Sequence, residues 1–159
     1  MDHLIEVHKK FLSELIESEV NFMIAGGYAV IYHGYVRTTS DMDIWLKPDN
    51  NNRERLVQLL IKNNFSKEAI EFVSRLDFTS PVAFHFGRPP EKMDFFTAMV
   101  GLDFVTSIKN VSWLEVENIR IPFLSLEDLV MNKMMTTRKK DEADVEILQK
   151  IQQFKRKKN

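Results

Sequence analysis

Apolar residues recur at intervals of three and four in the first part of the chain. This spacing places them on one face of a helix, and it predicts an amphipathic helix over about residues 2–18. His8 falls on that face, and we interpret it as a packing residue rather than a ligand. The positions that carry this prediction are Leu4, Ile5, His8, Phe11, Leu12, Leu15 and Ile16.

Short apolar runs bounded by glycine, proline and polar turn residues predict the strands. The last two runs flank Glu117 and Asn118, and this pattern is typical of a hairpin. The runs are Phe22–Ala25, Met42–Leu46, Pro81–Phe86, Lys92–Phe96, Trp113–Val116 and Ile119–Phe123.

The remaining helical patterns complete the predicted order of elements. A short helix is expected at Tyr28–His33, ended by Gly34. Longer helices are expected over about 51–63, 126–136 and 141–154, with Asp141 as the N-cap of the last. The stretch 65–80 is ambiguous. This order predicts an α/β (α+β) domain, with a small mixed sheet flanked by helices. The short strands and the hairpin argue against a doubly wound parallel sheet.

The length and composition fit one folded domain. With 159 residues, 44% of them hydrophobic, the chain can bury a core of its own. We assign residues 1–155 to a single domain and residues 156–159 to a basic tail, which we expect to be frayed and solvated. Cysteine is absent, and this excludes disulfides, zinc–thiolate sites and cysteine nucleophiles.

Charge and hydropathy narrow the choice of partners. The net charge of −1 arises from 22 basic and 23 acidic residues, so the chain has no overall attraction for nucleic acid or an anionic membrane. No apolar run approaches the length that spans a membrane. The first six residues carry neither the basic nor the apolar region of an export signal. We therefore expect a cytoplasmic protein with no membrane partner.

Three aspartates lie in or beside apolar, strand-like runs. Asp41 and Asp43 are two residues apart, so a strand projects both to one face, and Asp94 lies in a later run. Ionised carboxylates are costly there unless they are paired or bind a cation. Three acids can hold two Mg²⁺ ions and leave ligand positions for a triphosphate. The alternatives are that Asp41 caps a turn, Asp43 forms a salt bridge and Asp94 faces solvent on an edge strand.

A glycine pair precedes these acids, at the turn between the first strand and the short helix. The backbone N–H groups of Gly26 and Gly27 can bind phosphate oxygens, because glycine permits a close approach. Arg37 and Thr38 follow before Asp41, and Arg37 fits a phosphate or carboxylate clamp. The alternative for Arg37 is a solvated loop arginine.

One motif resembles the signature of the polymerase-β-type nucleotidyltransferase superfamily. It consists of Gly26-Gly27-Tyr28-Ala29, His33-Gly34, Arg37-Thr38 and Asp41-Met42-Asp43. The motif is most similar to the minimal bacterial branch that includes the AbiEii-type toxins. The C-terminal segments 126–133 and 138–144 resemble the same branch, so the resemblance spans residues 22 to about 150. Two departures are a Gly-Gly pair where the superfamily often has Gly-Ser, and a length short of the full toxins.

The resemblance implies a nucleotidyltransferase fold and an enzyme that moves a nucleoside monophosphate from an NTP to a hydroxyl or phosphate acceptor. Asp41, Asp43 and Asp94 would be catalytic and would bind two Mg²⁺ ions, with Mn²⁺ as the alternative. The acceptor stays open between tRNA, a small molecule such as an antibiotic, and a protein, and a toxin would have a cognate antitoxin. The nucleotide would be bound by Gly26, Gly27, Arg37, Thr38, Lys133 and Lys140.

Two charged residues near the C-terminus lie on or beside apolar helix faces. Lys133 could direct its ammonium toward a triphosphate, or extend past the apolar stripe to water. Asp144 shares a helix face with three apolar residues and therefore needs a partner. We interpret Asp144 as a residue that orients Arg138, Lys140 or Lys133, rather than as a metal ligand.

Two other interpretations of the chain remain open. The protein could be a catalytically inactive nucleotide-binding or protein-binding module of the same fold, although the intact set of three acids argues against this. Alternatively, the acids could be structural and the likeness a coincidence. A structure in which Asp41, Asp43 and Asp94 lie far apart would favour the coincidence.

Overall fold

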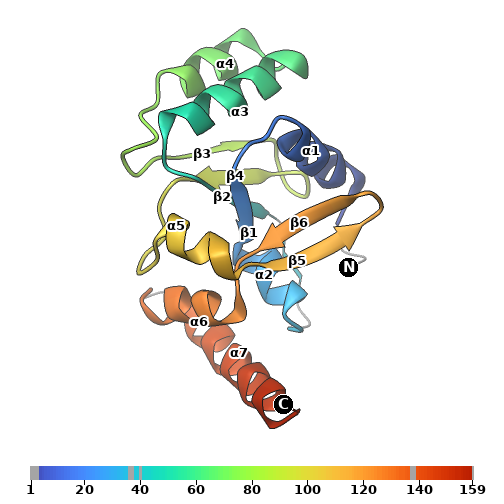
Figure 1. Ribbon diagram of the computed structural model, residues 1–159, viewed down its shortest axis with the longest axis vertical. Helices are drawn as coiled ribbons and strands as arrows, with labels where there is room; N and C mark the ends of the chain where they lie inside the picture. The colour runs from blue at the N-terminus through green and yellow to red at the C-terminus, as the bar shows by residue number, and fades with distance from the viewer. Residues whose placement is uncertain (1–3, 36–37, 40, 137–138, 159) are drawn as a thin grey trace.

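The structure is a computed structural model that describes residues 4–35, 38–39, 41–136 and 139–158, without the side chains of residues 139 and 140. Within this part of the chain, six strands form one sheet in the order β3-β4-β2-β1-β6-β5 (Figure 1). The strands are β1 (Phe22–Ala25), β2 (Met42–Leu46), β3 (Ala83–Phe86), β4 (Met93–Phe96), β5 (Ser112–Val116) and β6 (Ile119–Phe123).

Helices lie at both ends of the molecule in Figure 1, with α3 and α4 above the sheet and α6 and α7 below it. None of the described helices is long and apolar enough to cross a membrane. The helices are α1 (Glu6–Glu17), α2 (Gly26–Tyr32), α3 (Asn50–Lys62), α4 (Lys67–Ser74), α5 (Phe104–Ser107), the 3₁₀ helix η1 (Ile108–Asn110), α6 (Leu126–Met134) and α7 (Lys139–Lys158).

The sheet is mixed in direction. Its two central strands, β1 and β2, are antiparallel to one another, whereas β6 runs parallel to β1 and β4 runs parallel to β2. The edge strands β3 and β5 are antiparallel to their neighbours. The predicted α/β class with a small mixed sheet is therefore confirmed, and a doubly wound parallel sheet is excluded.

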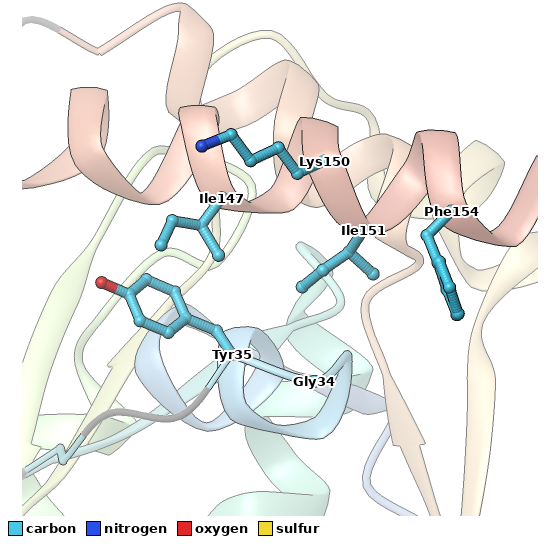
Figure 2. A pocket seen from close by; sticks show the side chains of 6 residues that line it. All are labelled: Gly34, Tyr35, Ile147, Lys150, Ile151 and Phe154. Carbon is cyan, nitrogen blue, oxygen red and sulfur yellow. The ribbon is translucent and has the colours of Figure 1, made fainter.

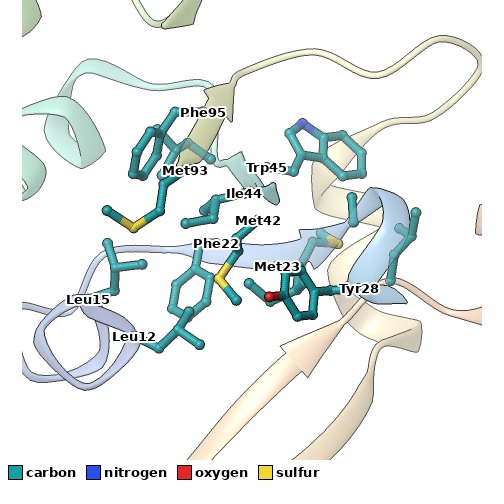
Figure 3. Close-up of a cluster of buried hydrophobic side chains, with 14 of the residues drawn as sticks. Leu12, Leu15, Phe22, Met23, Tyr28, Met42, Ile44, Trp45, Met93 and Phe95 are labelled. Atoms are coloured by element: carbon teal, nitrogen blue, oxygen red, sulfur yellow. The ribbon is translucent and has the colours of Figure 1, made fainter. Parts of the chain in front are cut away.

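Aromatic rings fill the core beside β3 and β4. Phe95 is fully buried and stacks on Phe84 with 5.1 Å between ring centroids, while Phe11 of α1 meets Phe95 edge-on at 5.8 Å. Met42 and Met93 lie in the same buried cluster (Figure 3). Because side chains alternate along a strand, the residues next to these methionines can project to the opposite face of the sheet.

His33 holds the end of α2 in place. It directly follows the helix and is buried, and its Nε2–H donates to the backbone carbonyl oxygen of Leu124 at 2.8 Å. The Nδ1 atom has no hydrogen-bond partner among the described residues. Burial lowers the pKa of His33 because desolvation disfavours the imidazolium, and the hydrogen bond to Leu124 opposes part of this shift.

The predicted strands are confirmed to within two residues, and the helices differ more. Helix α1 begins at Glu6 rather than near residue 2, and the ambiguous stretch contains α4, whose N-cap Ser66 accepts a hydrogen bond from the N–H of Ala69. Helices α5 and η1 were not predicted, because three or four residues are too few to show a helical period. Helix α7 continues to Lys158, so residues 156–158 of the basic tail are exposed but helical rather than frayed.

Candidate active site where two parallel strands begin

Strand register brings two of the three predicted acids together. Strands β2 and β4 run parallel, and Asp43 pairs directly with Asp94. Neighbouring strands lie about 4.8 Å apart, so these two carboxylates project side by side from one face. Immediately before this pair of residues, Met42 pairs with Met93, and both methionines are buried in the core. The alternating pattern of β2 and β4 thus separates a buried apolar face from a partly exposed acidic one.

The third acid, Asp41, immediately precedes β2 and is joined to Asp94 through a lysine. The Nζ atom of Lys92 lies 3.6 Å from Oδ2 of Asp41 and 3.4 Å from Oδ1 of Asp94. One ammonium therefore contacts both carboxylates, which excludes the possibility that these acids are far apart. Asp94 raises the pKa of Lys92 above its ordinary value, and Asp41 adds to the shift because both negative charges favour the ammonium.

Lys92 was missed as a site residue by the sequence analysis. It lies two residues before Asp94, and strand alternation would place the two side chains on one face. That signal was present in the sequence. What the sequence did not show is that the same ammonium also reaches Asp41, because this contact depends on the pairing of β2 with β4.

The carboxylate set has the chemistry of a site for a hard divalent cation. Oδ1 of Asp41 is buried and has no hydrogen-bond partner in the described part of the chain. Carboxylate oxygens are the ligands that Mg²⁺ prefers. Among the described residues, no three His, Asp or Glu side chains already converge as a metal site. The oxygen donors fit a divalent cation, while the ammonium of Lys92 supplies the positive charge between two of them.

The glycine pair makes room for this acidic face. Gly26 has a φ of +59°, and a Cβ atom at this position would overlap Oδ2 of Asp43. A Cβ atom at Gly27 would lie 2.5 Å from Oγ1 of Thr39. A side chain at either position would therefore push against the acidic strand or the segment before it. The need for glycine here follows from close packing, and binding of phosphate by these residues remains a prediction.

A buried histidine and a buried tyrosine lie close enough to Asp41 to feel its charge. The Tyr28 hydroxyl is 3.4 Å from Nδ1 of His8, and the two rings meet edge-on. Burial lowers the pKa of His8 and raises the pKa of Tyr28, and the charge of Asp41 adds to the shift of the tyrosine. Both side chains are packed in the core, as expected for His8 from its place on the apolar face of the helix.

Lys133 is engaged by helix α7 rather than by solvent. Its Nζ atom lies 3.0 Å from Oδ1 of Asp141 and 3.0 Å from Oδ2 of Asp144, and all three side chains are buried. The expectation that Asp144 orients a basic residue is therefore confirmed for Lys133. Asp141 is not the N-cap of α7, because the helix already begins at Lys139 and the Asp141 carboxylate instead accepts hydrogen bonds from Lys133 and the Thr136 hydroxyl.

The other predicted nucleotide-binding residues are described incompletely. Arg37 lies outside the described residues, as does the side chain of Lys140. Thr38 is exposed. The structure therefore does not test whether these residues bind nucleotide, and the burial of Lys133 leaves its own nucleotide role a prediction.

A pocket of about 450 Å³ lies between the end of α2 and α7. The pocket is an open groove, with a volume in the range of sites for small molecules. Figure 2 shows Ile147 and Ile151 directed from α7 toward Tyr35, with Phe154 one turn further along the helix. The residues that line the pocket are Gly34, Tyr35, Ile147, Lys150, Ile151 and Phe154.

Comparison with known proteins identifies the fold. No family model and no curated protein matches the sequence. The solved structure of the lincosamide antibiotic adenylyltransferase LnuA, bound to lincomycin, is similar to this chain with a TM-score of 0.53 and 14% sequence identity. The match covers 94% of this chain and 99% of that chain. At this identity the likeness shows the fold alone, so the nucleotidyltransferase fold is confirmed and the AbiEii-like branch stays a prediction.

Proposed function

We propose that this protein is a nucleotidyltransferase that transfers a nucleoside monophosphate from an NTP to a hydroxyl or phosphate acceptor. The observation that carries the proposal is the in-register pairing of Asp43 with Asp94 in a nucleotidyltransferase fold, with Asp41 joined to Asp94 through Lys92. Strand pairing and one shared ammonium thus gather the three acids where β2 and β4 begin.

In this proposal each acid has a stated role. Asp41, Asp43 and Asp94 would hold Mg²⁺, or Mn²⁺ in its place, and Asp94 would also accept the proton of the attacking group. The acceptor oxygen forms a bond to the α-phosphorus, the bond between that phosphorus and the bridging oxygen to the β-phosphate breaks, and pyrophosphate leaves. The divalent cations held by these acids would supply the positive charge that offsets the phosphates. The chain supplies positioning and electrostatic stabilisation.

Four of the proposed nucleotide-binding residues precede these acids in the sequence motif. The backbone of Gly26 and Gly27 approaches phosphate, and Arg37 and Thr38 bind phosphate oxygens. We keep the predicted roles of Lys133 and Lys140 as well, with Lys133 acting on the nucleotide only if it exchanges its contacts with the acids of α7.

We propose a small molecule that carries a hydroxyl group as the acceptor. The pocket between α2 and α7 has a suitable volume, and its lining combines apolar side chains with the Lys150 ammonium. The net charge of −1 gives no general attraction for a large RNA. The competing outcome of the same assay is transfer to tRNA or to a protein. That outcome would favour a toxin-like enzyme, which would have a cognate antitoxin.

The function is tested with α-³²P-labelled NTPs, Mg²⁺ and a panel of small-molecule extract, total RNA and total protein. We expect label in a small-molecule product and release of pyrophosphate. Asp43→Asn should lower transfer by roughly 100-fold or more, because it removes a carboxylate that would hold the divalent cation against the reacting phosphates. Glu115→Gln is the matched control, since it makes the same change on an exposed residue of β5.

Two results would contradict the proposal. Transfer by Asp43→Asn at the level of the unaltered protein would show that the acidic face is not the site. Tight binding of NTP with Mg²⁺ in calorimetry, without pyrophosphate release for any acceptor class, would favour the inactive module.

A further inference from the structure

Lys92 is held over the acidic face by its backbone as well as by its charge. The N–H of Met42 in β2 donates to the carbonyl oxygen of Lys92 at 3.0 Å, which fixes the start of β4 against β2. The side chain then reaches Asp41, just before β2, and Asp94 in β4. The Lys92 side chain is 28% exposed, so its ammonium has a path to solvent.

The ammonium occupies the electrostatic position that a divalent cation would take. Three carboxylates on one face repel one another, and a positive charge between them offsets this repulsion. Lys92 contacts Oδ2 of Asp41 and Oδ1 of Asp94, so a cation that binds between these two carboxylates competes with its ammonium. A lysine is suited to such an exchange, because its charge sits at the end of a flexible four-carbon stem.

We infer that Lys92 is a built-in counter-ion that holds Asp41 and Asp94 together when no metal is bound and is displaced when a divalent cation binds. This inference rests on the proposed function, because it takes the acidic face to be the metal site. It assigns to Lys92 a positioning role that weakens metal binding and prevents repulsion in the metal-free protein.

The size of the competition follows from the geometry. Removal of the ammonium removes two partly exposed ion pairs that metal binding must otherwise break. Two pairs of ordinary exposed strength correspond to a roughly 2- to 30-fold difference in metal affinity. A neutral residue at position 92 should therefore tighten metal binding by this factor.

The test measures Mn²⁺ binding to the full chain through the electron paramagnetic resonance signal of the free ion. Lys92→Met and Lys92→Gln remove the charge, and two such variants guard against misfolding of one, which circular dichroism would detect. Lys92→Arg keeps the charge. Lys47→Met is the matched control, because Lys47 pairs with Asp49 at 3.5 Å just beyond the other end of β2.

We expect Lys92→Met and Lys92→Gln to bind Mn²⁺ roughly 2- to 30-fold more tightly than the unaltered protein. Lys92→Arg and Lys47→Met should bind as the unaltered protein does. If the unaltered protein binds Mn²⁺ and both neutral variants bind it no more tightly, the counter-ion role of Lys92 is overturned, while the proposed function stands. Equal binding by the unaltered protein and Asp43→Asn would overturn the metal site itself, and with it the proposed function.

Discussion

The most direct test of how the C-terminal helices are held together is Lys133→Met. Lys133 on α6 contacts Asp141 and Asp144 on α7, at 3.0 Å in each case, and all three side chains are buried. Asp141 also accepts a hydrogen bond from the hydroxyl of Thr136, at 2.6 Å. Methionine matches the length of the lysine stem but carries no charge, so the substitution takes one cationic partner from two buried carboxylates.

The expected loss of stability is large. Removal of one partner from a buried ion pair costs about 3–5 kcal/mol, because the remaining charge stays desolvated. For a chain of 159 residues this corresponds to a fall in Tm of roughly 6–20 °C. Asp144→Asn should cost less, about 1.5–3 kcal/mol, because Lys133 then keeps Asp141.

The assay is urea unfolding followed by circular dichroism, with a double-mutant cycle of Lys133→Met and Asp144→Asn. The double variant should be less destabilised than the sum of the single variants, by about 0.5–3 kcal/mol. Lys150→Met is the matched control on α7, and it should change stability by less than about 0.5 kcal/mol, since its pair with Glu146 is exposed. A Lys133→Met variant as stable as Lys150→Met, or an additive double variant, would refute the reasoning.

Three further outcomes follow from the structure. Gly26→Ala should lower the free energy of unfolding by at least about 1–2 kcal/mol, because the φ of Gly26 is +59°. The variant should also lose transfer activity, because the new Cβ atom overlaps Asp43. Normal activity would contradict the tight packing of the site. The free energy of unfolding should decrease as the pH falls below 6.5. In this range His33 of the unfolded chain binds a proton, whereas buried His33 of the folded chain stays neutral because its pKa is lowered. The slope is up to about 1.4 kcal/mol per pH unit, and it should be smaller in His33→Gln urea titrations. Phe95→Ala should lower the free energy of unfolding, measured in urea, by about 3–5 kcal/mol, because the ring is fully buried. A loss below about 1 kcal/mol would contradict the observed packing.

Much of the fold could be predicted from local patterns. Each predicted strand was found because a short apolar run ended at glycine, proline or polar residues, and α3 and α6 were found from helical spacing. Helix α5 was missed because four residues show no period, and Asp141 was misplaced as an N-cap because its buried partner on α6, Lys133, was not visible in the sequence. The strand order β3-β4-β2-β1-β6-β5 was not predicted, since it depends on packing between segments far apart in the chain.

The sequence by itself predicted that Asp41 and Asp43 share a face, because the period of a strand is two residues. It also determined that a glycine pair precedes them and that Asp94 lies in a similar strand. Only the tertiary structure decided that Asp94 lies beside Asp43 and that one ammonium, that of Lys92, reaches two of the acids. Alternation along a strand is a local property of the backbone, whereas register between strands is set by the packing of the whole core.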